Sequence, residues 1–106
     1  MLIYSSTGHL VYYKLGRMDS DGVTFLPNEG FIDDGLTLDF GEFYAARSFI
    51  DEPNDNLRTL WGWIRETRQD SELIQAGWAG LMSLPRAIGV STGQDQIVRL
   101  TMQPHP

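Results

Sequence analysis

Turn-forming residues recur about every eight to twelve residues along this chain, which leaves room only for short secondary-structure elements. The plainest turn signals are residues 5–8 (SSTG), 19–22 (DSDG) and 51–56 (DEPNDN). The runs between the turns are rich in β-branched and aromatic residues, which favour strands. The pattern predicts about seven short strands, at residues 2–4, 10–15, 23–26, 43–50, 57–64, 81–90 and 96–102.

Some segments carry mixed signals. Residues 43–50 (FYAARSFI) are also compatible with a helix, but the flanking Gly and Pro and the terminal aromatics favour a buried strand. Pro85 interrupts residues 81–90, which predicts a sheet edge or a bulge there. Residues 66–75 form the one charged, helix-compatible stretch, and residues 28–39 predict a crossing loop.

The sum of these elements indicates an all-β protein, which leaves a sandwich, a barrel or a propeller as architectures. At 106 residues the chain is one domain at most. No clean internal repeat is visible, which argues weakly against a propeller because blades can diverge in sequence.

Composition excludes several classes of partner. The formal net charge is −6 and the only lysine is Lys14, so we expect neither nucleic-acid binding nor contact with an anionic membrane. No apolar run reaches the about 18 residues that a membrane helix needs, and the N-terminus lacks a signal-peptide pattern. There is no cysteine, and His9 and His105 have no metal-ligand spacing, so neither a metal nor another cofactor is expected.

Three segments occur in a recognisable order: residues 39–46 (DFGEFYAA), 60–64 (LWGWI) and 77–86 (GWAGLMSLPR). Together they resemble glycoside hydrolase family 32, which holds invertases, inulinases, levanases, fructan exohydrolases and plant fructosyltransferases. The third segment is the most specific. Residues 1–35 resemble the family only in their succession of strands and turns. The resemblance implies a five-bladed β-propeller followed by a β-sandwich, with the active site in the central funnel.

The catalytic motifs of that family do not occur in these 106 residues. The family pattern has a nucleophilic Asp in Asn-Asp-Pro, a transition-state-stabilising Asp in Arg-Asp-Pro and an acid/base Glu in Glu-Cys-Pro; none is present. By this resemblance, residues 1–106 are a single partial domain. It would hold the outer strands of the fourth blade and the complete fifth blade, without the β-sandwich.

The resemblance also implies three substrate-binding residues. Asp39 corresponds to the acid that bonds hydroxyls of the sugar next to the scissile fructosyl, and Tyr44 begins the innermost strand. Glu42 stands where plant members that favour sucrose often have a basic residue. As a catalytic pair, Asp39 and Glu42 fit poorly, because an extended chain separates their Cα atoms by about 10 Å. The alternative for residues 39–41 is a plain turn in which Asp accepts backbone N–H bonds.

Other aromatic residues have simpler expected roles. Trp61 and Trp63 alternate and so share one face of a strand, where packing between blades is favoured over sugar stacking. Trp78, between Gly77 and Gly80, predicts a turn around a buried ring. Arg86 is expected to end a strand and to bond loop carbonyls.

The resulting prediction is a fragment of a retaining glycoside hydrolase that releases terminal fructose from sucrose or fructans. We expect it to be inactive alone, with a small carbohydrate as its ligand. The alternative is a non-catalytic remnant with weak carbohydrate binding or no function; an unrelated all-β binding domain is a third option. Exposed blade faces and open strand edges also predict self-association. No compartment follows from these residues.

Overall fold

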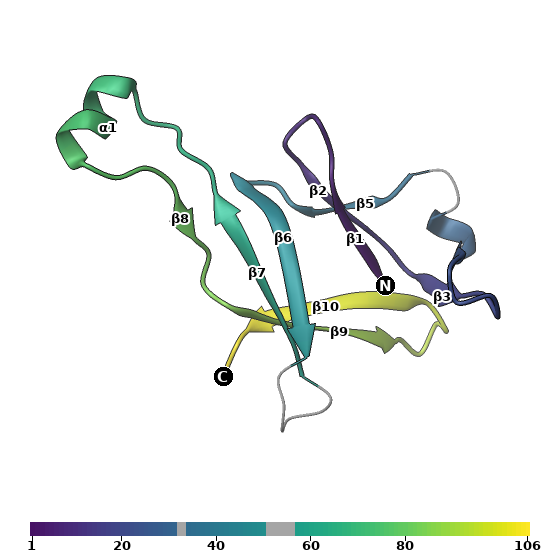
Figure 1. Ribbon diagram of the computed structural model, residues 1–106. Coiled ribbons are helices and arrows are strands. Elements are labelled where there is room, and N and C mark those ends of the chain that lie inside the picture. Colours follow the sequence, from purple (N-terminus) through teal and green to yellow (C-terminus); the bar gives the residue numbers. More distant parts are fainter. Residues whose placement is uncertain (32–33, 51–56) are drawn as a thin grey trace.

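The computed structural model describes residues 1–31, 34–50 and 57–106. The predicted turn at 51–56 and two residues of the predicted loop at 28–39 therefore lie outside the described residues. Figure 1 shows an arrangement of short strands with one small helix at its periphery. The all-β prediction is confirmed. The strands are β1 (Leu2–Ser5), β2 (Val11–Lys14), β3 (Gly16–Met18), β4 (Phe25–Pro27), β5 (Leu36–Asp39), β6 (Phe43–Ile50), β7 (Arg58–Ile64), β8 (Leu81–Met82), β9 (Arg86–Thr92) and β10 (Val98–Pro104).

The largest sheet is an antiparallel meander in the order β10-β9-β7-β6. Short β8 pairs with the far end of β7, where Trp63 lies opposite Met82. The predicted strand at 81–90 is therefore two strands, because Pro85 has no N–H to donate to a continuous ladder. In β6 the register shifts between Tyr44 and Arg47, and Ala45 between them has a positive φ of 51°.

A second sheet has the order β1-β2-β5. The prediction of a crossing loop at residues 28–39 is wrong for its described part, which contains the 3₁₀ turn Glu29–Phe31 and strand β5. Strand β5 forms because it pairs with β2, with Leu36 opposite Tyr13 and Asp39 opposite Val11. A separate two-stranded sheet joins β3 to β4.

The two larger sheets share one apolar core. The core residues are Val11 and Leu38 from the smaller sheet and Phe43, Ala46, Leu60 and Ile88 from the larger one. Full burial of a side chain such as Phe43 or Leu60 is worth about 1.5–3 kcal/mol. Packing across this core brings the C-terminal end of β5 close to the larger sheet, which positions the site described below.

Between β7 and β8 the chain forms helix α1 (Asp70–Ala76), which lies away from both sheets (Figure 1). The predicted helical stretch at 66–75 is thus confirmed in part. At the N-terminus of the helix, the Glu72 side chain accepts a hydrogen bond from the Gln69 N–H at 2.9 Å. Gly77, with φ of 75°, ends it in the left-handed conformation that glycine adopts without cost. No residue of this helix is buried.

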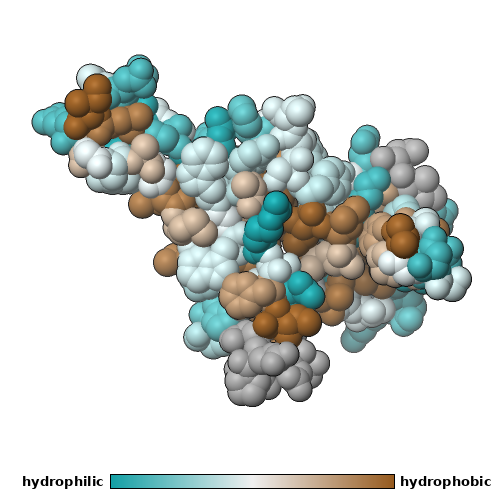
Figure 2. Space-filling model, viewed as in Figure 1, coloured by the Kyte–Doolittle hydropathy of each residue, from teal (hydrophilic) through white to brown (hydrophobic). Residues whose placement is uncertain are grey.

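Several large apolar side chains remain exposed. Figure 2 shows hydrophobic patches distributed over the visible face rather than hidden inside. The most exposed described residues of this kind are Val23, Phe40, Ile74 and Leu84, each more than four-fifths exposed. Within the described residues, no helix has the length and apolar character needed to cross a membrane.

Candidate functional site

The three sequence motifs converge on the ring of Phe43, the first residue of β6. Phe43 is 1% exposed and lies directly over Gly62 of β7. A Cβ atom at position 62 would stand 2.3 Å from Cε2 of this ring, so glycine is the residue that lets the ring seat on the strand. On the ring also lies the guanidinium of Arg86, whose Cζ is 4.5 Å from the ring centroid.

Arg86 joins the two sheets at this point. It stands at the start of β9, and its Nη1 donates to Oδ2 of Asp39, at the end of β5, at 2.7 Å. The same nitrogen is 3.5 Å from Sδ of Met102 on β10. The side chains of Arg86 and Asp39 are 25% and 20% exposed, so the ion pair is partly shielded but open to a ligand. The expectation that Arg86 ends a strand and bonds loop carbonyls is therefore wrong.

Asp39 is held from two directions. Its Oδ1 accepts the Gly41 N–H at 2.8 Å, as expected for a turn, while Oδ2 accepts Arg86. Burial raises the pKa of Asp39, but the hydrogen bonds from Arg86 and Gly41 and the charge of Arg86 outweigh it and hold the pKa below its ordinary value. The carboxylate is consequently ionised at neutral pH and available as an acceptor.

Glu42 and Tyr44 have separate partners. The Glu42 carboxylate forms an ion pair with Arg65 at 3.2 Å, and the Arg65 N–H donates to the Glu42 carbonyl at 3.0 Å. The Tyr44 hydroxyl donates to the Ser6 carbonyl at 2.9 Å, and its ring meets His9 edge-on, with 5.5 Å between centroids. Asp39 and Glu42 thus pair with different arginines, which agrees with their poor fit to a catalytic pair.

Ser83 fastens the second motif to the third. Its hydroxyl accepts the Gly62 N–H at 3.0 Å, and its own N–H donates to the Gly62 carbonyl at 2.8 Å. Ser83 is buried, with 6% of its surface exposed. This pair of bonds continues the β7–β8 pairing past Met82 and carries the chain towards Arg86.

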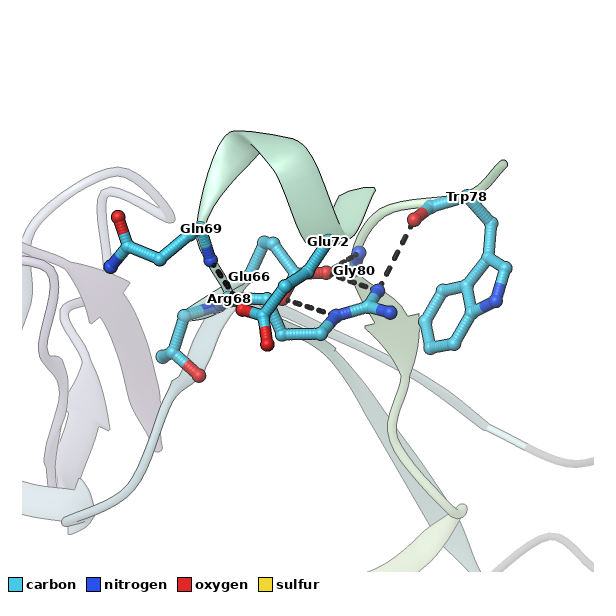
Figure 3. A network of polar contacts seen from close by, with 7 residues as sticks. Glu66, Arg68, Gln69, Glu72, Trp78 and Gly80 are labelled. Carbon is cyan, nitrogen blue, oxygen red and sulfur yellow. Dashed lines mark hydrogen bonds and ion pairs between the residues drawn. The ribbon is translucent and has the colours of Figure 1, made fainter. Parts of the chain in front are cut away.

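The segment between β7 and β8, which carries α1, forms an arm. Polar contacts among Glu66, Arg68, Trp78 and Gly80 join the two ends of this arm, and we call them the clasp (Figure 3). The Glu66 carboxylate accepts two bonds from the Arg68 guanidinium, at 2.9 and 2.7 Å, and one from the Gly80 N–H at 3.1 Å. The guanidinium lies 4.0 Å from the ring centroid of Trp78 and also donates to the Trp78 carbonyl. The sequence pattern predicts only a charged, helix-compatible stretch at residues 66–75 and gives no signal for these contacts.

The tryptophans of β7 and of the segment that carries α1 differ in their surroundings. Trp78 was expected to be a buried ring, but it is 51% exposed, because its neighbours form an arm that projects from the sheets. Trp61 and Trp63 occupy alternate positions of β7, opposite Arg47 and Tyr44, as predicted for one shared face. Their packing between blades, favoured over sugar stacking, stays a prediction.

A groove of about 630 Å³ runs along one side of Arg86. Its lining is mostly apolar and comes from the end of β7, the segment 81–86 and β10. The lining residues are Ile64, Leu81, Met82, Ser83, Leu84, Pro85, Arg86, Met102, Gln103 and Pro104. Among the described residues, no group of three or more His, Asp or Glu side chains is placed to hold a metal ion.

Known proteins match this chain over nearly its whole length. The family model described as "Glycosyl hydrolases family 32 N-terminal domain" matches residues 2–104. A fructan 6-exohydrolase of Beta vulgaris is 38% identical over 90 residues, which are 83% of this chain and 15% of that protein. A β-fructofuranosidase (insoluble isoenzyme 2) of Daucus carota is 34% identical, over 83% of this chain and 15% of that protein.

Comparison with a solved structure indicates the same family. The crystal structure of fructan 1-exohydrolase IIa from Cichorium intybus superposes with a TM-score of 0.75 at 33% sequence identity. The match covers 91% of this chain and 18% of that one. This chain thus spans about one sixth of the length of such relatives. The chain belongs to glycosyl hydrolase family 32.

Proposed function

We propose that these 106 residues supply a sugar-contacting part of a β-fructofuranosidase-like propeller, and that the catalytic carboxylates lie outside them. The whole enzyme would release terminal fructose from sucrose or a fructan with retention of configuration. The observation that carries this proposal is the Asp39 carboxylate, ionised and fixed by Arg86 within the motif that resembles the family's sugar-binding segment.

The sheet arrangement supports a division into blades. A propeller blade is a four-stranded antiparallel sheet, and β6, β7, β9 and β10 form such a meander in chain order. This sheet would be the complete fifth blade, with β6 innermost. Strands β1, β2 and β5 would be the outer strands of the fourth blade. The innermost strand of that blade would pair with the edge of β1 that does not face β2. The chain would then hold no part of the β-sandwich.

Three residues would contact the sugar. Asp39 would accept hydrogen bonds from hydroxyls of the sugar beside the scissile fructosyl. Glu42 directly precedes β6, Tyr44 is the second residue of that strand, and both would line the same sugar site. The Arg65 guanidinium balances the charge of the Glu42 carboxylate, which is compatible with a neutral carbohydrate as ligand.

Catalysis would need groups that this sequence lacks. Retaining hydrolysis uses a nucleophile and an acid/base residue about 5–5.5 Å apart. The family motifs that carry them do not occur between Met1 and Pro106. The same observation favours the second candidate, a non-catalytic remnant that binds carbohydrate weakly or has no function.

A fructose-release assay tests the proposal. The purified chain is incubated with sucrose and with inulin, and free fructose is measured after long incubation. We expect no release above the buffer control. Fructose release that is abolished by Asp39→Asn or by Glu42→Gln would mean that these two carboxylates catalyse, and would overturn the proposal.

A further inference from the structure

We propose that Arg86 is a positioning residue for the sugar site: it fixes the Asp39 carboxylate in the orientation that accepts hydroxyls of a neutral fructoside. This inference rests on the proposed function, since it takes Asp39 as the sugar-binding acid. It assigns a role to a residue that the sequence motif alone places only in a strand-ending turn.

The first argument is that Arg86 itself is held in place. Its guanidinium lies on the ring of Phe43 and reaches Sδ of Met102. Phe43 cannot yield, because it is 1% exposed and is pressed against Gly62. A planar guanidinium that rests on a fixed ring presents its N–H groups in one direction. The donor that reaches Asp39 is therefore preorganised.

The second argument is that Asp39 keeps free acceptor capacity. An ionised carboxylate has about four lone-pair sites. Among the described residues, Oδ1 accepts one N–H from Gly41 and Oδ2 accepts one from Arg86. One site on each oxygen is left, and the side chain is 20% exposed. Two adjacent sugar hydroxyls, both donors, match this arrangement.

A purely structural role is the competing explanation. The Arg86–Asp39 pair links the end of β5 to the start of β9, so it could serve only as a latch between sheets. A latch would change the stability of the fold, but the folded variants would still bind sugar with the affinity of the wild type. The two roles therefore separate when affinity is measured on folded protein.

The experiment is a sucrose titration of the ¹⁵N-labelled full chain, followed at the Gly41 amide, which donates to Asp39. The variants are Arg86→Met, which removes the donor, and Arg86→Lys, which keeps the charge but not the planar group. The matched control is Arg99→Met, because Arg99 pairs with Asp95 at the remote β9–β10 turn. Spectral dispersion verifies that each variant is folded.

We expect the wild type and Arg99→Met to give the same saturable shift. Arg86→Met should weaken the apparent affinity by about tenfold or more, the size expected for loss of a hydrogen bond to a charged group, and Arg86→Lys should have an intermediate effect. Equal affinity in the wild type and in both Arg86 variants would overturn the inference while leaving the sugar site intact. Loss of the folded spectrum in both Arg86 variants would make Arg86 a latch and also overturn it. Absence of any shift in the wild type would overturn the proposed sugar site itself.

Discussion

Gly62 lies so close to the ring of Phe43 that a single methyl group at position 62 would overlap it, at 2.3 Å from Cε2 and 2.4 Å from Cζ. The ring has no room to move, because it is fully buried between the two larger sheets. The Arg86 guanidinium lies over the same ring, with its Cζ 4.5 Å from the ring centroid, and forms the ion pair with Asp39. The candidate site thus depends on a contact that involves no polar group.

Gly62→Ala should destabilise the fold. The added Cβ forces either the Phe43 ring or strand β7 to shift, and overpacking of this kind costs about 1–3 kcal/mol. The free energy of unfolding in urea measures the effect. Gly30→Ala is the matched control, since a Cβ at Gly30 meets nothing within 4 Å and should change stability by less than about 0.5 kcal/mol. Equal stabilities of the two variants would show that the Phe43 ring is not confined.

Ser83→Ala should also destabilise the fold, through a lost hydrogen bond. The Ser83 hydroxyl is the acceptor for the buried Gly62 N–H, and a buried donor left without a partner costs about 1–3 kcal/mol. The same urea titration measures it. Ser91→Ala provides the control, because Ser91 is exposed on β9 and its loss should be nearly neutral. A neutral Ser83→Ala would mean that water or another group replaces the hydroxyl.

The clasp at Glu66 should survive mild acidification. Hydrogen bonds from the Arg68 side chain, then from backbone N–H groups including that of Gly80, hold the pKa of Glu66 well below its ordinary value. A lowered folded-state pKa means that the stabilisation is present above the unfolded pKa of about 4.3 and is lost only as pH falls through the lower folded value.

The Gly80 amide and Trp78 indole resonances report this directly. Between pH 7 and about pH 4 both should stay constant, because the Glu66 carboxylate remains ionised over this window. In Glu66→Gln both should lie at new positions at every pH. A titration midpoint of the Gly80 amide near the ordinary glutamate pKa would contradict the clasp.

The apolar groove beside Arg86 should promote self-association of the isolated chain. Leu84, a groove residue, is 84% exposed, and transiently exposed apolar surface drives aggregation at about μM–mM concentrations. Sedimentation velocity should show species larger than 12.0 kDa, which Leu84→Glu reduces. Val23→Glu is the control: Val23 is 83% exposed but does not line the groove. Equal effects of both substitutions would indicate that added charge, and not the groove, decides association.

Much of the fold follows from local sequence. The predicted strands at 2–4, 43–50 and 57–64 agree with β1, β6 and β7 to within about a residue or two at each end, which is the usual uncertainty of such boundaries. These segments combine aromatic and β-branched residues with strong turn signals on their flanks. Strand β5 was missed because the four residues Leu36–Asp39 carry little signal of their own and become a strand only by pairing with β2.

The site was harder to predict than the strands. Asp39 and Arg86 are 47 residues apart, and no spacing rule brings them together. Their contact depends on the packing of two sheets around Phe43, which is a property of the tertiary structure. The Trp78 prediction failed for a related reason, since its flanking glycines serve an exposed arm and not a buried turn. The one local signal available was the Asp39–Gly41 turn, which is confirmed.

The central claim is that these residues belong with catalytic carboxylates located elsewhere in a β-fructofuranosidase-like protein. The most direct measurement is the DNA sequence for several hundred codons upstream of the Met1 codon, read in the same frame. We predict an open frame that encodes Asn-Asp-Pro, Arg-Asp-Pro and Glu-Cys-Pro in that order. A closed frame in which those motifs are absent or broken would contradict the claim and leave a non-catalytic chain.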